Sequence, residues 1–183
     1  MLFRSEDVAP GPFAVVDVGG GSTELVTTGG AISMQMGSVR LTERFVRTDP
    51  PSAENLRALE ATVALKLDEA RHVPAADANT LIAVAGTATT VQGIALELGH
   101  YDPEQTHRTW LTLEAADGVL IDLAQMTNAE RAAIPVMPPG RGDVIVAGAV
   151  ILVAVMRRFG FDRVLVSEAD ILDGLVFEML GIR

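Results

Sequence analysis

The sequence predicts an α/β domain with a mixed sheet that begins with a three-stranded antiparallel meander and is flanked by helices. Near the N-terminus, three short β-rich segments follow one another with no helical pattern between them. Further along, apolar strand-like runs alternate with helical patterns, which is typical of an α/β layer. The chain has 183 residues, of which 49% are hydrophobic. That length and composition suit one domain with a sizeable core.

The expected meander occupies residues 13–18, 23–28 and 31–38. Its first segment, "FAVVDV", is an apolar run that ends in glycines. Gly29 and Gly30 separate the second segment from the third, and such a pair readily supplies the positive-φ residues of a hairpin turn. We therefore expect these three segments to pair in an antiparallel arrangement.

A helix and a strand follow the meander, and then a second helix. Residues 53–70 carry leucines and a valine on one helical face, and Ser52 is placed to cap that helix. Residues 79–87 are apolar without a break, as in a strand buried on both faces. Residues 88–99 read as a helix that Gly99 closes.

The C-terminal half is expected to add three helices, a short extended piece and a last strand before a final helix. Thr127 and Glu130 form a capping-box pattern. Asp143 precedes a long apolar helix and is placed to cap it. The apolar part of that helix, residues 144–156, falls short of the ~20 residues that span a bilayer. The expected elements are a loop at 100–108, an extended piece and helix within 108–126, a helix after 127, a helix at 143–159, a strand at 161–170 and a helix at 171–181.

The composition excludes some functions and favours a cytoplasmic location. A net charge of -10 and a pI of about 4.6 argue against binding to nucleic acid, because the phosphate backbone is held by clustered Lys and Arg. The chain contains no Cys, which fits a reducing compartment. Its N-terminus lacks the apolar segment of a signal peptide. An anionic ligand would have to be held by local groups.

The strongest motif is "DVGGGSTE", residues 17–24, at the end of the first strand. Consecutive glycines let the backbone turn sharply and approach a ligand, and their N–H groups can converge on phosphate oxygens. The motif lacks the spacing of a dinucleotide-binding loop and the Lys of a P-loop, and a strand follows it. It therefore predicts a hairpin that cradles phosphate. The candidate phosphate-binding residues are Gly19, Gly20, Gly21, Ser22 and Thr23.

Two carboxylates, Asp17 and Glu24, flank this hairpin. Carboxylates beside a phosphate can hold Mg²⁺, directly or through water, or can orient an attacking water molecule. We therefore treat both residues as candidate catalytic residues and candidate magnesium ligands. The alternative is a glycine-rich hairpin with two solvated acids.

Other candidates lie at the ends of later strands. Gly86 and Thr87 follow the buried strand and precede a helix, where α/β proteins commonly bind anions. The alternative for Thr87 is a helix cap. Arg141, in "PPGRGD", is placed to contact a phosphate. Glu168 also follows a strand.

The stretches "FAVVDVGGGSTELV", "LIAVAGTATT", "PPGRGDVIVAGAVIL" and "RVLVSEADILDGL" resemble the exopolyphosphatase and guanosine pentaphosphate phosphohydrolase family in order and spacing. The resemblance runs from Phe13 to the end of the chain. It implies an actin-like ATPase fold, in which two ribonuclease-H-like domains close over a cleft. In that family the counterpart of residues 17–24 is the second phosphate-binding loop. The resemblance thus assigns phosphate to Gly19–Ser22, magnesium and water to Asp17 and Glu24, and the cleft lining to Gly86 and Thr87.

Family members also have a domain ahead of this hairpin, which carries the first phosphate loop and a catalytic glutamate. Here only residues 1–12 precede the strand, so residues 13–183 are expected to be the second domain alone. The implied reaction is hydrolysis of the terminal phosphoryl group of polyphosphate or guanosine pentaphosphate, slow or absent in this chain by itself. A surface left open by the first domain would favour a homodimer. The alternative function is a non-catalytic phosphate- or nucleotide-binding regulatory module. A small-molecule kinase would need an adenosine pocket that the sequence does not reveal.

Overall fold

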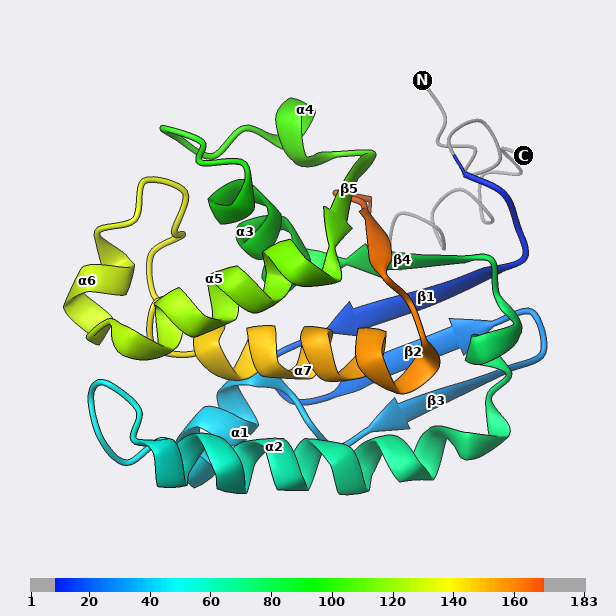
Figure 1. Ribbon diagram of the computed structural model, residues 1–183, viewed down its shortest axis with the longest axis horizontal. Helices are drawn as coiled ribbons and strands as arrows, with labels where there is room; N and C mark the ends of the chain where they lie inside the picture. The colour runs from blue at the N-terminus through cyan, green and yellow to red at the C-terminus, as the bar shows by residue number, and fades with distance from the viewer. Residues whose placement is uncertain (1–8, 170–183) are drawn as a thin grey trace.

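A computed structural model describes residues 9–169, which form a six-stranded mixed sheet covered by helices (Figure 1). The strand order is β3-β2-β1-β4-β6-β5. Strands β1, β2 and β3 pair antiparallel, while β4 and β6 continue the sheet parallel to β1. The expected meander and mixed sheet are therefore confirmed. The strands are β1 Phe13–Val18, β2 Thr23–Thr27, β3 Gly30–Met34, β4 Thr80–Val84, β5 Thr109–Thr112 and β6 Arg163–Val166.

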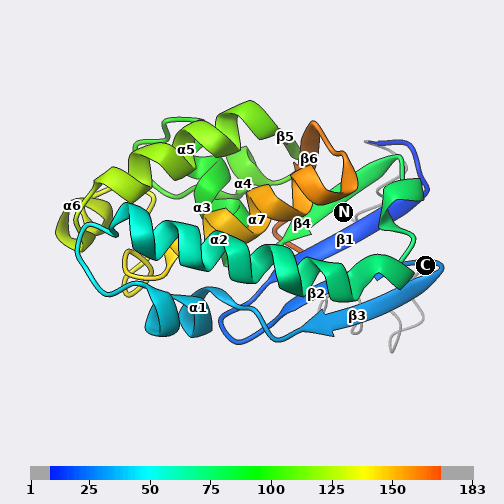
Figure 2. The ribbon, with the colours of Figure 1, turned by 60° about the horizontal axis from the view of Figure 1, so that its bottom comes forward.

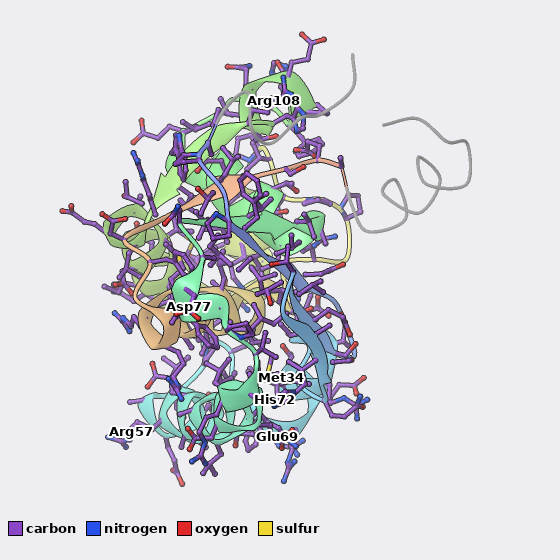
Figure 3. All side chains as sticks on the ribbon, turned by 90° about the vertical axis from the view of Figure 1, so that its right-hand side faces the viewer. Met34, Arg57, Glu69, His72, Asp77 and Arg108 are labelled. Atoms are coloured by element: carbon purple, nitrogen blue, oxygen red, sulfur yellow. The ribbon has the colours of Figure 1, made fainter. Side chains whose placement is uncertain are left out.

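Helices α1, α2, α5 and α7 lie on one side of the sheet (Figures 1 and 2). Figure 3 shows the same arrangement from the side, with Arg57 of α2 projecting away from the strands. The main hydrophobic core fills the space between these helices and the sheet. The helices are α1 Ser38–Phe45, α2 Ala53–Leu67, α3 Ala85–Ala95, α4 Pro103–Thr106, α5 Leu113–Gln125, α6 Asn128–Ala132 and α7 Ile145–Phe159, with short 3-10 turns at Asp68–His72 and Ala75–Asp77.

Helix α7 is the centre of the helical layer and lies between α2 and α5 (Figure 1). Nearly all of its side chains are buried, as its unbroken apolar sequence predicts. It ends at Gly160, whose φ of 79° gives the left-handed cap that glycine adopts most easily. Within residues 9–169, no helix is long and apolar enough to cross a membrane.

The sheet alternates its side chains between two faces, and this alternation separates the polar residues from the core. In β1, Val16 and Val18 are buried under the helices, whereas Asp17 points to the opposite face. A smaller cluster that includes Ile82 and Leu165 lies apart from the main core. One face of β1 therefore packs into the main core, and the other face carries Asp17.

Several expectations about helix starts and ends are wrong. Helix α1 was not expected, because the β-rich run before it hides its short amphipathic pattern. Helix α3 begins at Ala85, three residues earlier than expected, and its C-cap is Leu96 instead of Gly99. Asp143 does not cap α7. The N-cap is Val144, and the Val144 side chain makes no capping hydrogen bond. The expected loop at 100–108 contains the short helix α4.

The turn between β2 and β3 also differs from expectation. Neither Gly29 nor Gly30 has a positive φ. A Cβ at Gly29 would instead lie 2.7 Å from Pro74 Cγ, so space and not conformation favours glycine there. The helix expected at 171–181 lies outside the described residues.

We predict that Ser52→Ala lowers the free energy of unfolding by about 1 kcal/mol, because the Ser52 hydroxyl accepts the backbone N–H of Asn55 at 3.2 Å and caps α2. Ser52→Asp keeps an acceptor and should retain most of the stability. Denaturant unfolding of both variants measures the effect. Equal unfolding midpoints for Ser52→Ala and the parent chain would show that the cap contributes nothing.

Candidate functional site

The glycine turn between β1 and β2 is held in place by the N-terminus of α1. The backbone N–H of Ser38 donates to the Gly19 carbonyl at 2.9 Å. The N–H groups of Val39 and Arg40 both donate to the Gly20 carbonyl, at 3.0 and 3.1 Å. The first turn of α1 thereby satisfies its unpaired donors with carbonyls of the turn. Strand β1 and helix α1 are joined at this point.

This arrangement fixes the direction of the neighbouring N–H groups. In a planar trans peptide the C=O and the N–H point in opposite directions. Since the carbonyls of Gly19 and Gly20 point into α1, the N–H groups of Gly20 and Gly21 point away from it. Among the described residues, neither N–H group has a hydrogen-bond acceptor. Two adjacent free donors of this kind suit an anion.

Close approach, and not unusual dihedral angles, favours glycine at Gly20 and demands it at Gly37. Gly19, Gly20 and Gly21 all lack a positive φ. A Cβ at Gly20 would lie 3.2 Å from Val39 Cγ2. A Cβ at Gly37, the N-cap of α1, would overlap the backbone between Gly20 and Gly21. Gly37 is therefore part of the site, although its sequence context gave no sign of this.

A cavity of about 320 Å³ opens at the carboxyl ends of β1 and β4. Its walls come from the glycine turn, the starts of α1, α3 and α7, and the loop before α7. The structure thus brings together four residues that the sequence predicted separately: Gly19, Gly20, Gly86 and Arg141.

Helix α3 presents its N-terminus to this cavity. Its N-cap is Val84, whose apolar side chain cannot bond the first turn. The first N–H groups of α3, which have no intrahelical partners, therefore also lack a side-chain cap, and the helix dipole adds partial positive charge. Ala85 has a φ of 65°, in the left-handed region that alanine rarely adopts. This sharp strand-to-helix turn brings Gly86 to the cavity wall.

Arg141 lies directly over Gly86. A Cβ at Gly86 would overlap the Arg141 guanidinium, so glycine leaves the space that the cation occupies. The buried Nε of Arg141 has no hydrogen-bond partner among the described residues. Arg141 also forms no ion pair within residues 9–169, so its guanidinium at the cavity wall is suited to recognition of an oxyanion.

A second arginine, Arg131, holds the loop that carries Arg141. Its side chain is 2% exposed, and it donates to the carbonyls of Gly142, Leu123 and Met126. It also pairs with Asp49, at 3.4 Å between Nη2 and Oδ1. Burial lowers the pKa of this guanidinium, and the Asp49 carboxylate opposes the shift. Arg131 therefore fixes the position of the loop that carries Arg141.

Asp17 and Glu24 are directly opposite each other on β1 and β2. This register places their Cβ atoms about 5 Å apart on one face of the sheet. Both are half-buried, and Ser33 on β3 donates to Glu24 Oε1 at 2.5 Å. Neither lines the 320 Å³ cavity. The two carboxylates adjoin the glycine turn from the other face of the sheet.

By itself the pair supplies only some of the oxygen ligands that a magnesium ion needs. Among the residues that the structure describes, no group of three or more acidic, His or Cys side chains could hold a metal. Mg²⁺ commonly binds one or two carboxylates and takes its remaining oxygens from water and substrate phosphates. Asp17 and Glu24 match that requirement and would rely on phosphate for the rest.

Four of the predicted phosphate-binding residues do not line the cavity. Gly21 is exposed at the end of the glycine turn. Thr23 is fully buried, and its hydroxyl donates to the Met36 carbonyl at 2.5 Å. Thr87 is neither a helix cap nor part of the cavity lining, since its buried hydroxyl donates to the Val18 carbonyl at 3.2 Å. Ser22 is half-buried beside the turn. Thr23 and Thr87 therefore support the turn from behind.

Sequence reasoning missed Arg40. Its Nε donates to the Gly21 carbonyl at 2.7 Å, and its Nη2 donates to Gln35. The side chain is exposed, so a cation lies at the rim of the glycine turn. The only signal in the sequence was the spacing of three residues between Gly37 and Arg40. This spacing has meaning only when Gly37 is known to be the N-cap of α1.

Glu168, at the end of β6, belongs to a separate polar group. Its carboxylate accepts the hydroxyls of Tyr101, at 2.5 Å, and of Thr106. Burial and then Glu168 raise the pKa of Tyr101, whereas the Thr89 hydroxyl and, more weakly, Arg141 oppose the shift. His107 Nδ1 accepts the backbone N–H of Glu168. These contacts tie the segment before β5 to the end of β6.

Comparison with known sequences identifies the family of this chain. The model of the Ppx/GppA phosphatase family matches residues 3–182, and the chain belongs to that family. It is 39% identical to exopolyphosphatase 2 of Mycobacterium tuberculosis, over 94% of this chain and 57% of the relative. It is 35% identical to a bifunctional 3-dehydroquinate synthase/phosphatase of Fusobacterium nucleatum, over 90% of this chain and 26% of the relative.

Solved structures show the same fold. A crystal structure of an exopolyphosphatase-like protein aligns with a TM-score of 0.91 and 36% identity, over 97% of this chain and 62% of that one. The Ppx/GppA family member of Aquifex aeolicus aligns with a TM-score of 0.85 and 29% identity, over 93% and 57%. The actin-like ATPase fold is therefore confirmed. The chain spans about half the length of the curated exopolyphosphatases that it matches.

We predict that Ala85→Gly raises the free energy of unfolding by about 1 kcal/mol, because it relieves the positive φ of an alanine. Ala88→Gly, inside the same helix, is the matched control and should lower stability. Thermal or denaturant unfolding distinguishes the two. If both variants were destabilised alike, the turn into α3 would carry no strain.

Proposed function

We propose that this chain supplies the phosphate-binding half of a phosphohydrolase that removes the terminal phosphoryl group of polyphosphate or guanosine pentaphosphate. One observation carries the proposal. On a protein with a net charge of -10, the glycine turn, the start of α3 and Arg141 meet at one cavity, where they offer hydrogen-bond donors and positive charge. The exopolyphosphatases among the relatives support polyphosphate as the substrate class.

Each group has a distinct role in this proposal. The N–H groups of Gly20 and Gly21 bind non-bridging phosphate oxygens, and the first turn of α3 adds further donors. Arg141 places a fixed positive charge beside the same phosphate. Donors that are already oriented stabilise the charge that develops during transfer without reorganising. The chain thereby binds and polarises the phosphoryl group that is to be transferred.

Asp17 and Glu24 would hold Mg²⁺ at the edge of the glycine turn. When bound there, magnesium neutralises charge on the phosphate oxygens. Of the two, we assign to Glu24 the orientation of a water molecule, because the Ser33 hydroxyl donates to only one of its two carboxylate oxygens. A catalytic glutamate on a preceding domain, as the family resemblance implies, would complete the site.

A second candidate is a phosphate- or nucleotide-binding regulatory module without catalysis. The favouring observation is that the described residues lining the cavity include no carboxylate. Phosphate release from polyphosphate by the highly purified chain separates the two. We expect very slow phosphate release or none from this chain alone, and steady magnesium-dependent release would place a base within it.

Self-association to a homodimer also stays a prediction, which light scattering over a range of concentrations tests.

We predict that Gly86→Ala weakens tripolyphosphate binding about tenfold, because a methyl group there displaces the Arg141 guanidinium. Arg141→Gln should weaken binding by a similar factor, and the double variant should add little. Titration calorimetry measures all three. Gly99→Ala, at a glycine with open space around it, is the control. Full affinity in Arg141→Gln would remove the arginine from the site.

We predict that Glu24→Gln abolishes the gain in tripolyphosphate affinity that magnesium confers, while affinity without magnesium is retained. The substitution keeps the size and hydrogen bonding of the side chain but removes its charge. The exposed carboxylate of Asp122, on α5, provides the matched control Asp122→Asn. Calorimetry with and without magnesium reports the difference. A magnesium effect that survives in Glu24→Gln would mean that this carboxylate is only a solvated strand residue.

A further inference from the structure

Helix α1 and the short segment after it carry three arginines that the phosphate site does not use in full. Arg40 and Arg44 are one helical turn apart on the exposed face, and Arg47 follows the helix end. Arg47 Nη2 donates to the Arg44 carbonyl at 3.0 Å, so its side chain folds back along α1. The three form a continuous row, which we call the arginine ridge: Arg40, Arg44 and Arg47.

The ridge begins at the phosphate site. Val39 lines the 320 Å³ cavity, and Arg40 donates to the carbonyl of Gly21 in the glycine turn. Since an α-helix rises 1.5 Å per residue, the eight residues of α1 extend the ridge by about 12 Å from the turn. A ligand bound at the turn and longer than the cavity can therefore follow α1.

The charges of the ridge are not neutralised by the protein. None of the three arginines forms an ion pair within the described part of the chain. By contrast, Arg71, Arg157 and Arg158 elsewhere on the surface are each paired with an aspartate. The one carboxylate of α1, Glu43, is exposed near the ridge without pairing to it. On an acidic protein, three arginines in a row with no ion-pair partner are a local site for a polyanion.

We infer that the arginine ridge binds the phosphates of a polyphosphate chain that extend beyond the terminal ones held at the glycine turn. The inference rests on the proposed function and narrows it: a long chain reaches Arg44 and Arg47, whereas a short phosphate ligand fills only the cavity. A guanidinium group can bind two phosphate oxygens at once. Because the ridge arginines are exposed and flexible, a chain of repeating phosphates can bind them in more than one alignment. The ridge thereby favours long polyphosphate over guanosine pentaphosphate.

The test compares Arg44→Gln/Arg47→Gln with Arg71→Gln/Arg163→Gln in the same chain. The control pair removes the same charge from exposed sites in the turn after α2 and at the amino end of β6, far from the glycine turn. Binding of long-chain polyphosphate and of tripolyphosphate is measured by calorimetry over a series of salt concentrations. Circular dichroism and thermal unfolding establish that both variants remain folded.

The ridge variant should bind long-chain polyphosphate about tenfold more weakly. The slope of log affinity against log salt should fall by about two, one for each arginine that no longer meets a phosphate. Its tripolyphosphate affinity should be unchanged, and the control pair should alter long-chain affinity much less. Equal weakening in the two double variants, or none in either, overturns the ridge. If tripolyphosphate binding is absent, or is unaffected by Arg141→Gln, the proposed function fails first and the ridge with it.

Discussion

The hydrogen bonds between the N-terminus of α1 and the carbonyls of Gly19 and Gly20 are the constraint on which the site depends. They orient two peptide planes, and those planes leave the N–H groups of Gly20 and Gly21 directed away from α1. The absence of a side chain at Gly37 permits this approach, because α1 meets the turn backbone to backbone. Without that contact the glycines would form a flexible turn with no fixed donor direction.

The packing beneath the cavity serves the same geometry. Helix α7 passes under the starts of α1 and α3 at Gly148, where a Cβ would lie 2.8 Å from Thr87 Cγ2 and 3.5 Å from Ser38 Cβ. This glycine lets three helix starts converge on one cavity. On the opposite wall, Arg131 anchors the loop of Arg141 and pairs with Asp49, which lies in the connection after α1. The Arg131–Asp49 pair therefore connects the loop of Arg141 to the segment after α1.

Much of the fold follows from local patterns. The apolar run of β1, the capping Ser52 and the Thr127–Glu130 box each specify an element through residues close in sequence, and these predictions are confirmed. Helix α1 has only eight residues, and the first N–H groups of this helix donate to a turn that lies far back along the chain. Patterns within a short window cannot reveal such long-range bonds.

The candidate site likewise combines residues that local patterns predict with residues that only the folded chain brings together. Residue type alone did not reveal that Thr23 and Thr87 would turn inward, since strand parity and the helix start decide which side they face. The roles of Gly37, Arg40 and Arg131 likewise emerge only when distant elements are packed together.

The most direct test of this account is a titration of the ¹⁵N-labelled chain with tripolyphosphate, followed by amide NMR. The account predicts saturable shifts concentrated at the N–H groups of Gly20, Gly21 and Gly86, with smaller changes along α7. Shifts centred elsewhere, with these three amides unmoved at saturation, would contradict the claim that the glycine turn and the start of α3 bind phosphate.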